Sequence, residues 1–369
     1  MLITVPWGER LGGAEVMLQT WLDGAGERGH ELELLFLEDG SWPAQLRAGG
    51  LHVEVIEAGR MRQPLRMMSC IWSVSRLLRR RRPELIVNWM PKTQLYCAPA
   101  ALLAGMSGRV LWWQHEITRG HWLDRAATLL PAQAVGCSSS AAARAQERLW
   151  PRRETFVVAP GTRVPAQPAP ASARPSGEAP PIVGLVGRLQ PWKGQDRLLR
   201  AQLMLRQRGC EIHTLIVGGD AHGLSPDYAA SLPGLIAELG LSGAVTLTGQ
   251  LADAGPEIER MDILVNASDP EPFGIALLEA MARGVPVVAV GSGGPAELIE
   301  DGVTGVLARS GDPGALADAL EPLIDSPERR RALGHAGRER FLREFTDTAM
   351  RQRLLDRLEE LAARVAAGR

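Results

Sequence analysis

The sequence predicts an α/β protein built from two domains, each with a parallel sheet covered by helices on both faces. Apolar strand-like runs alternate with helix-like runs along the whole chain, which is the pattern of strands joined by crossover helices. At 369 residues the chain is longer than one ordinary hydrophobic core serves. A Pro/Ala/Ser-rich segment without a periodic apolar face divides it near the middle.

Short apolar runs give the expected strands, and the periodic segments between them give the expected helices. In the first half, strands are expected near residues 2–5, 32–37, 53–56, 85–89, 110–113, 134–137 and 156–158. In the second half, they are expected near residues 182–186, 214–217, 245–247, 263–265, 285–290 and 306–308. Helices are expected at 14–22, from Asp196 onward, at 275–282 and, as a last amphipathic helix, at 346–367.

The Pro/Ala/Ser-rich segment sets the expected domain boundaries. We expect a first domain over residues 1–164, an extended linker over 165–181 and a second domain over 182–345. No repeat of fixed short period is visible, but the alternation implies two similar doubly wound halves.

Composition excludes several classes of function. The formal net charge of -1 gives no basic footprint for nucleic acid. No apolar run reaches membrane-spanning length, and the first residues lack the basic region that opens a signal peptide. The cysteines have no metal-like spacing; they are Cys70, Cys97, Cys137 and Cys210. A reduced, cytoplasmic protein is therefore expected.

The segment from Glu271 to Glu279 carries the sharpest functional signal. It places two carboxylates eight residues apart, around a Phe-Gly turn that follows an apolar strand and opens a helical run. Such a turn binds phosphate, because Gly274 admits a ligand close to the backbone and the first helical N–H groups are free. Glu271 then lies in the loop, and Glu279 lies about two turns along the helix. A purely structural role opposite the helix dipole is the alternative for both carboxylates.

Two cations are expected at the end of a neighbouring strand. Arg188 and Lys193 follow the apolar run 182–186 and precede a helix. Arg grips two phosphate oxygens and Lys supplies a compact charge, so the pair suits a pyrophosphate. For this segment alone, two ordinary cations on a solvated loop are the alternative.

Taken together, these motifs resemble those of glycosyltransferase family 4. The similarity covers nearly the whole chain in the right order and is strongest from Pro181 to Val306. It rests on the Gly-Arg and Lys-Gly pairs around Arg188 and Lys193, on Glu271 and Glu279, on Gly293-Gly294-Pro-Ala-Glu297, and on Gly12-Gly13 after the first strand.

The resemblance implies a retaining GT-B enzyme. Its fold would be two Rossmann-like doubly wound domains facing across a cleft, with segment 346–369 crossing back to the first, acceptor-binding domain. The second domain would bind a nucleoside-diphosphate sugar of hexose type, with UDP favoured and GDP as the alternative. The acceptor would be a natural product, a lipid-linked sugar or a polysaccharide.

The resemblance also implies roles for individual residues. The catalytic set is Arg188 and Lys193 on the departing diphosphate, Glu271 on a donor-sugar hydroxyl, and His115 near the donor sugar. The donor-binding set is Gly12, Gly13, Phe273, Gly274, Ile275 and, on the ribose, Glu279. A structural histidine oriented by Glu116 remains the alternative for His115, and a plain strand-to-helix turn remains the alternative for the two N-terminal glycines.

Neither a metal nor a cofactor is expected, because the sequence contains no Asp-x-Asp motif and no His/Cys cluster. Cations and the helix dipole would then neutralise the charge that grows on the leaving diphosphate. The family favours substitution on the same face of the sugar, with the departing phosphate assisting deprotonation of the acceptor. Glu271 is accordingly expected to bind a hydroxyl, unlike the nucleophilic carboxylate of retaining glycosidases.

Residues 60–82 form the most basic stretch and contain an amphipathic helical pattern. Such a helix suits an anionic membrane and a peripheral location at its inner face. Cations at a helix C-terminus before Pro83 give the routine alternative. Trp112, Trp113 and Trp122 are expected to divide between core and acceptor wall.

Two other functions stay open on the sequence alone. A GT-B epimerase would convert the nucleotide-sugar without an acceptor, although carboxylates typical of such enzymes are not evident. A non-catalytic sugar-nucleotide-binding subunit would share the fold, although Arg188, Lys193, Glu271 and Glu279 are all present.

Overall fold

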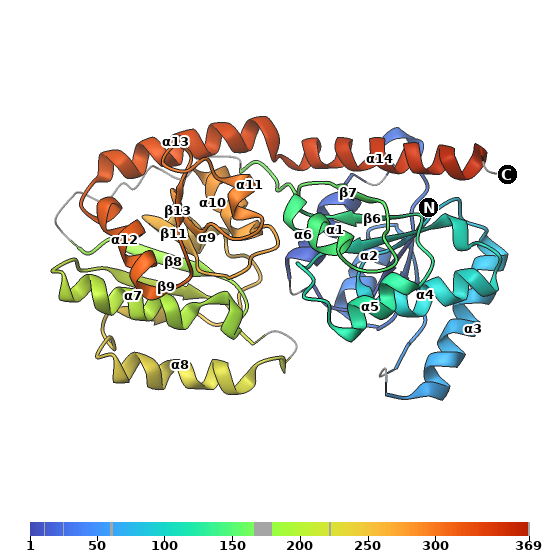
Figure 1. The fold of residues 1–369 in the computed structure, drawn as a ribbon, viewed down its shortest axis with the longest axis horizontal. Helices are drawn as coiled ribbons and strands as arrows, with labels where there is room; N and C mark the ends of the chain where they lie inside the picture. The colour runs from blue at the N-terminus through green and yellow to red at the C-terminus, as the bar shows by residue number, and fades with distance from the viewer. Residues whose placement is uncertain (11, 25, 60–61, 166–178, 221–222, 368–369) are drawn as a thin grey trace. The chain divides into compact units, whose positions relative to one another are not determined.

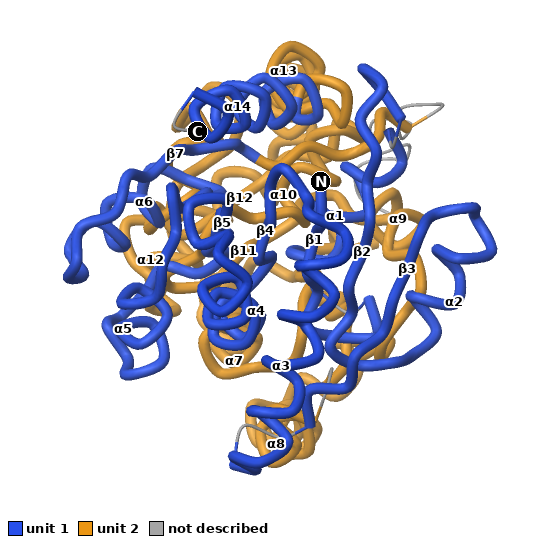
Figure 2. The backbone as a smooth tube through the Cα atoms, turned by 90° about the vertical axis from the view of Figure 1, so that its right-hand side faces the viewer, with its two compact units in different colours: residues 1–159, 350–369 blue, residues 160–349 orange. Residues whose placement is uncertain are grey.

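The computed structural model describes residues 1–369 apart from 11, 25, 60–61, 166–178, 221–222 and 368–369 (Figure 1). The chain divides into two compact units, which Figure 2 distinguishes by colour. Unit 1 comprises Met1–Ala159 and Met350–Arg369, and unit 2 comprises Pro160–Ala349. The linker expected over 165–181 falls largely on positions 166–178, which lie outside the described residues.

Within the described residues, unit 1 is a parallel sheet of seven strands in the order β3-β2-β1-β4-β5-β6-β7. The strands are β1 (Leu2–Val5), β2 (Glu33–Phe36), β3 (His52–Val55), β4 (Ile86–Asn88), β5 (Val110–Gln114), β6 (Ala134–Cys137) and β7 (Thr155–Val157). The helices are α1 (Gly13–Leu22), α2 (Ser41–Ala48), α3 (Pro64–Arg81), α4 (Pro91–Leu103), α5 (Trp122–Leu129) and α6 (Ser140–Glu147), with 3-10 turns η1 (Glu27–Gly29) and η2 (Ser107–Arg109).

Helices cover both faces of this sheet, and each face has its own apolar core. One core joins α3 and α4 to the sheet through residues such as Val74, Tyr96 and Trp112. The other joins α1 and α2 to the opposite face through residues such as Trp21 and Trp42. Because both faces are covered, the strands need continuous apolar runs, and β1 and β5 are buried along their whole length.

The last helix, α14 (Asp347–Ala367), returns to unit 1 and packs on the second of these cores. Four of its buried residues follow the three- and four-residue spacing of one helical face and lie in this core; they are Met350, Leu354, Leu358 and Leu361. The expectation that the C-terminal helix crosses back to the first half of the chain is therefore met.

Unit 2, as far as it is described, is a parallel sheet of six strands in the order β10-β9-β8-β11-β12-β13. The strands are β8 (Ile182–Val186), β9 (His213–Val217), β10 (Val245–Leu247), β11 (Ile263–Asn266), β12 (Val287–Val290) and β13 (Val306–Ala308). The helical segments are η3 (Pro191–Lys193), α7 (Gln195–Gln207), α8 (Pro226–Glu238), α9 (Gly255–Glu259), α10 (Ile275–Arg283), α11 (Pro295–Leu298), α12 (Pro313–Ile324) and α13 (Pro327–Glu344).

Several element ends differ slightly from the sequence expectation, and local chemistry explains them. Helix α10 continues to Arg283 because Gly284, at φ 74°, supplies the left-handed residue that ends it. Helix α3 ends at Arg81, and its C-cap Arg82 is left-handed at φ 51° because Pro83 disfavours helical backbone in the residue before it. The expected strand 85–89 shortens to β4, whereas β5 gains Gln114.

The strand order identifies where a ligand belongs in each sheet. Both sheets are of the doubly wound Rossmann type, with order reversal between β1 and β4 in unit 1 and between β8 and β11 in unit 2. Ligands of such sheets bind outside the carboxyl ends of the strands at this switch point. A ligand is therefore expected at the loops after β1, β4, β8 and β11.

Replacing Leu358 by Ala should reduce the free energy of unfolding of unit 1 by about 2–5 kcal/mol, because it leaves a cavity beneath α14. Urea unfolding followed by circular dichroism measures the change. Gln352→Ala, on the exposed side of the same helix, is the matched control and should leave stability nearly unchanged. Equal stability of the two variants would contradict the packing described for α14.

Candidate functional site

The two loops at the switch point of unit 2 carry most of the residues singled out in the sequence. The loop after β8 holds Arg188 and Lys193, and the loop after β11 holds Glu271 and Gly274. Strands β8 and β11 are hydrogen-bonded neighbours, so both loops emerge at the same edge of the sheet. The fold therefore brings together residues that lie some 80 positions apart in the chain.

Backbone contacts hold the two loops against each other. The amide of Asp269 donates to the carbonyl of Trp192 at 3.2 Å. Gly194 has φ 74° and approaches the carbonyl of Ala267 so closely that a side chain there would clash with it. Glycine at this position thus serves both the turn into α7 and the contact between loops.

A buried ion pair joins the side chains of these loops. The Nζ atom of Lys193 lies 2.7 Å from Oε2 of Glu271, and the two side chains are only 17% and 7% exposed. The same carboxylate oxygen accepts a hydrogen bond from Nδ2 of Asn266 at 3.2 Å. The Lys193 ammonium also lies 4.1 Å from the ring centroid of Trp192, a cation–π contact.

The charge state of Glu271 follows from these contacts. Burial acts to raise the pKa of the carboxyl, but the Lys193 ammonium and the hydrogen bonds from Ser268 and Asn266 outweigh burial and hold the pKa below its ordinary value. Glu271 is therefore a carboxylate throughout the neutral range, locked to its cation.

Arg188 lies in the same loop and is partly buried. Its carbonyl accepts a hydrogen bond from the side chain of buried Gln195 at 2.8 Å, which fixes the backbone of the loop. Its guanidinium forms no ion pair with any residue that the structure describes. A second cation thus lies five positions from Lys193, and no carboxylate in the described part of the chain pairs with it.

The N-terminus of α10 opens at this edge without a capping side chain. Gly274, at φ 104°, is the N-cap, and the first turn contains no acidic residue. The first amides of the helix therefore have no side-chain acceptor and present a partial positive charge. Phe273 turns its own ring into the interior, where it meets Phe345 with ring centroids 6.1 Å apart, and Ile275 begins the helix.

The third loop of the edge follows β12. The amide of Glu271 donates to the carbonyl of Ser292 at 3.3 Å, and the amide of Gly294 donates to the carbonyl of Glu271 at 2.8 Å. A side chain on Gly294 would clash with the backbone of Phe273. This close approach explains why position 294 requires glycine.

Glu279 lies on α10 beyond the first turn and is partly buried. Burial raises the pKa of its carboxyl to about 7, with Arg283 lowering it and Asp253 raising it to lesser extents. No side chain among the described residues donates a hydrogen bond to this carboxyl. Glu279 is therefore a poorly solvated acceptor to which no described side chain donates, which distinguishes it from a carboxylate that merely serves the helix dipole.

In unit 1, His115 follows β5 and its ring lies among tryptophans. The ring centroid is 4.8 Å from that of Trp89 and 6.2 Å from that of Trp113. Burial lowers the pKa of His115 to about 3, although a hydrogen bond with the backbone of Trp89 acts to raise it. The ring is therefore neutral. Its Nε2 atom is buried and has no hydrogen-bond partner among the described residues.

Gly12 and Gly13 open α1 at the same edge of the sheet. Gly12 is the N-cap, and a side chain there would meet the carboxylate of Glu15. The indole of Trp89 donates to the carbonyl of Ala14 at 2.9 Å while its ring contacts His115. Trp89 thereby links the glycine turn to the histidine.

Three tryptophans and one acid that lie close to His115 in the sequence have different environments. Trp112 and Trp113 are buried core residues, whereas Trp122 is 70% exposed at the start of α5. The idea that Glu116 orients His115 has no support, since Glu116 is exposed and its amide bonds to the side chain of Gln114.

Some residues of these edges escaped the sequence analysis. In unit 2 they are Asn266, Ser268, Trp192 and Gln195, which support Glu271, Lys193 and Arg188. In unit 1, Lys92 lies 3.2 Å from the carbonyl of Pro6 and 4.0 Å from the ring of Trp7. The sequence feature that could have identified one of them is a polar residue at the end of a buried strand, as at Asn266.

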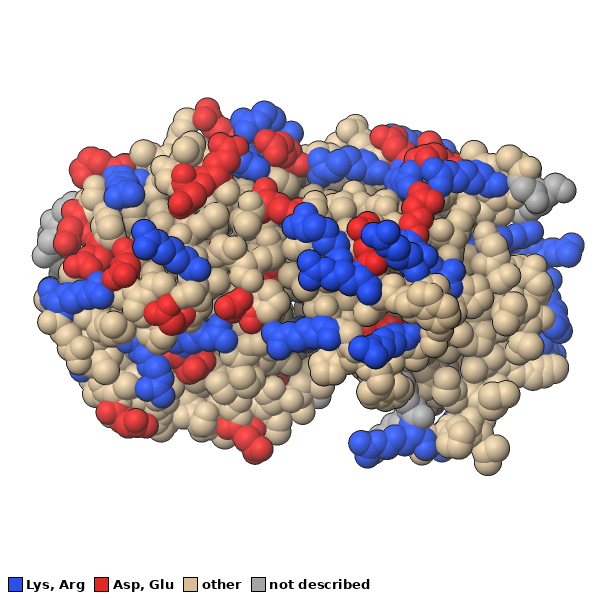
Figure 3. All heavy atoms as spheres, viewed as in Figure 1, with Lys and Arg blue, Asp and Glu red and all other residues tan. Residues whose placement is uncertain are grey.

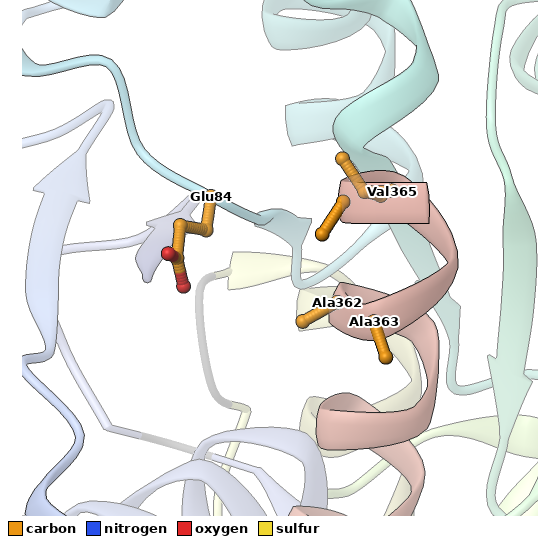
Figure 4. Close-up of a pocket in the computed structure, with 5 residues that line it drawn as sticks. Glu84, Ala362, Ala363 and Val365 are labelled. Carbon is orange, nitrogen blue, oxygen red and sulfur yellow. The ribbon is translucent and has the colours of Figure 1, made fainter. Parts of the chain in front are cut away.

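The depression shown in Figure 4 does not belong to either edge. It lies between Glu84 and the end of α14, beside Ala362, Ala363 and Val365. Glu84 precedes β4, so this depression is at the amino edge of the sheet, opposite the carboxyl ends. Among the described residues there is also no His/Cys/Asp/Glu group arranged to hold a metal and no helix long and apolar enough to cross a membrane.

Known relatives match parts or all of the chain. The D-inositol 3-phosphate glycosyltransferase of Nocardia farcinica is 40% identical over 187 residues, which is 48% of this chain and 41% of the relative, so less than half of that relative's length is matched. The lipopolysaccharide core biosynthesis glycosyltransferase LpsE of Rhizobium meliloti is 25% identical over 92% of this chain and 93% of its own length.

A solved structure is similar over nearly the full chain. The crystal structure of Anabaena Alr3699/HepE in complex with UDP and glucose has a TM-score of 0.82 and 26% identity, covering 97% of this chain and 98% of that one. The fold is therefore GT-B.

Family models cover both units. Residues 12–166 match the model described as a glycosyl transferase 4-like domain, and residues 171–340 match the model described as glycosyl transferases group 1. The two matches together extend over far more than half of the chain, in the order expected from the motifs. The chain belongs to glycosyltransferase family 4, of the GT-B fold.

Proposed function

We propose that this protein transfers a hexose-type sugar from a nucleoside-diphosphate sugar to an acceptor hydroxyl, with retention of configuration. The observation that carries the proposal is the carboxyl edge of unit 2. There a buried Lys193–Glu271 pair, the guanidinium of Arg188, which has no ion pair among the described residues, and the uncapped N-terminus of α10 lie at one switch point. This combination suits a diphosphate joined to a polyhydroxylated group.

The diphosphate end of the donor would meet the positive part of this edge. Arg188 would grip phosphate oxygens, Lys193 would be shared between phosphate and Glu271, and the amides of Phe273, Gly274 and Ile275 would complete the cradle. These groups are fixed before the reaction, so they favour the charge that develops on the leaving group. Because they supply positive charge themselves, we propose that transfer requires no metal.

Glu271 would bind a hydroxyl of the donor sugar. Its charge is held by Lys193 and its carboxylate is fixed by Asn266, which suits a hydrogen-bond acceptor of fixed position. A carboxylate so paired is a weak nucleophile. We therefore place retention on same-face substitution: the acceptor oxygen bonds to the anomeric carbon, the bond to the phosphate oxygen breaks, and the acceptor proton passes to the departing phosphate.

In unit 1, His115 would hydrogen-bond to substrate through the buried, unpartnered Nε2 atom. A neutral ring at this position fits an uncharged hydroxyl better than a phosphate. The glycine turn of Gly12 and Gly13 would let the same ligand approach the backbone at the start of α1.

UDP is the favoured nucleotide, supported by the UDP and glucose bound in the similar Anabaena protein. A GDP-sugar is the alternative donor. The acceptor would be a natural product, a lipid-linked sugar or a polysaccharide. An epimerase or a binding-only subunit is not favoured, since the relatives described above are named glycosyltransferases.

Thermal stabilisation against nucleoside diphosphates and nucleotide-sugars, with and without EDTA, tests the proposal. A shift with UDP or GDP that survives EDTA is the expected result, because a ligand that binds only the folded state raises the melting temperature. The absence of a shift with every nucleotide would overturn the proposed donor site.

Arg188→Ala should lower turnover at least tenfold, which corresponds to about 1.4 kcal/mol or more of barrier, and Lys193→Ala should do the same. Arg188 is the cleaner test, because Lys193→Ala also leaves the buried Glu271 unpaired and destabilises the fold. Arg200→Ala, an exposed cation on α7, is the matched control. Near-normal turnover in both test variants would remove the phosphate site.

Nucleotide binding should strengthen as pH rises from 6 to 8. The carboxyl of Glu279, with its pKa of about 7, is mostly protonated at the low end and a better acceptor for ribose hydroxyls once ionised. Ionisation of this carboxyl should raise nucleotide affinity roughly tenfold between pH 6 and pH 8, and isothermal titration calorimetry measures that affinity.

Glu279→Gln isolates that contribution, because the titration of the nucleotide's own phosphate affects both proteins equally. The variant should bind more weakly than the wild type at pH 8 and should lack part of the pH dependence. Identical pH profiles and affinities for the two proteins would refute the ribose role.

A further inference from the structure

Helix α3 of unit 1 has an outward face that neither core covers. Its inward face packs into the unit through residues such as Cys70, Val74 and Leu78. On the opposite side, Leu65 is 85% exposed, Met68 62% and Trp72 49%. Their spacing of three and four residues places these apolar side chains in one stripe.

The same face becomes basic along the helix. Arg76 continues the stripe one turn after Trp72, with its guanidinium 5.7 Å from the indole centroid, and Arg79 and Arg80 follow. The helix contains no Asp or Glu. Arg66, Arg76 and Arg80 form no ion pair with any described residue, although the chain as a whole has a net charge of -1.

The position of α3 leaves this face accessible. Figure 1 shows its N-terminal part extending beyond the helices around it in unit 1, and the space-filling view in Figure 3 shows uncharged and basic atoms there without acidic ones. Because α3 follows β3 and runs antiparallel to the strands, its N-terminus lies on the carboxyl side of the sheet.

We propose that the outward face of α3 docks on an anionic lipid bilayer. Leu65, Met68 and Trp72 would enter the boundary between headgroups and acyl chains, and the arginines would reach lipid phosphates. The helix is already folded and held by its inward face, so it would lie in the plane of the interface and not span the bilayer.

Charge favours a bilayer over a second copy of this chain as the occupant. Face-to-face association would bury the guanidinium groups of both copies against helices that carry no carboxylate, which costs more than it gains. An anionic bilayer supplies phosphate to these groups and an apolar layer to the stripe. Positions 60–61, part of the basic stretch expected to contact membrane, lie outside the described residues.

Co-sedimentation of the full chain with vesicles tests this docking. The probes are vesicles of phosphatidylcholine alone and of phosphatidylcholine mixed with phosphatidylglycerol, at low and high salt. The wild type should bind the mixed vesicles, with binding weakened by salt. The triple variant Leu65→Gln/Met68→Gln/Trp72→Gln should lose at least about tenfold in partitioning.

Two further variants separate the contributions. Arg76→Gln/Arg80→Gln should lose about tenfold or more on mixed vesicles and most of the preference over neutral ones. Leu224→Gln/Leu342→Gln, which changes two exposed apolar residues of unit 2, is the matched control and should partition like the wild type. The altered positions are exposed, so melting temperature and nucleotide binding should remain those of the wild type.

Three outcomes would overturn the proposal. One is a wild type that ignores mixed vesicles, and another is a triple variant that binds them equally well. The third is a wild type that forms a dimer in analytical ultracentrifugation when the triple variant, unlike the other variants, is a monomer. That result would assign the face to a second copy. None of these readouts uses sugar transfer, so failure here is distinguishable from failure of the proposed glycosyltransferase activity.

Discussion

The carboxyl edge of unit 2 depends on one buried ion pair, Lys193 with Glu271. Taking both charges out of water is costly, and removing either partner would leave the other uncompensated. The protein offsets that cost with a hydrogen bond from Asn266 and the ring of Trp192. The pair joins the loops after β8 and β11, and the backbone of Glu271 adds the loop after β12 through Gly294, so three loops share one charged centre.

The two switch points differ in chemistry although their sheets follow the same winding. Unit 2 presents cations, a fixed carboxylate and an open helix N-terminus. Unit 1 presents a neutral imidazole among tryptophan rings, with the pKa of His115 lowered to about 3. The strong electrostatics of the proposed reaction therefore belong to unit 2.

Local patterns in the sequence predict the sheets well, because both cores need continuous apolar strands. The sequence predicts that Lys193 and Glu271 lie at the same edge of the sheet, because the carboxyl ends of parallel strands lie together. It does not predict that the two side chains form an ion pair. The sequence also does not show which tryptophans are buried: Trp112 and Trp113 belong to the cores of unit 1, whereas Trp122 on the next element is exposed. The raised pKa of Glu279 depends on solvent exclusion by the folded unit. Asn266 acquires its role from a hydrogen bond to Glu271, five positions along the chain, which exists only once the loop has folded.

A crystal structure of the protein with bound UDP would decide whether the carboxyl edge of unit 2 is the donor site. We expect diphosphate oxygens within hydrogen-bond distance of Arg188 and Lys193, at the N-terminus of α10, with ribose hydroxyls on Glu279. Lys193 would remain in contact with Glu271 while it meets phosphate. UDP bound elsewhere on unit 2, with this edge unoccupied, would refute the proposed donor site.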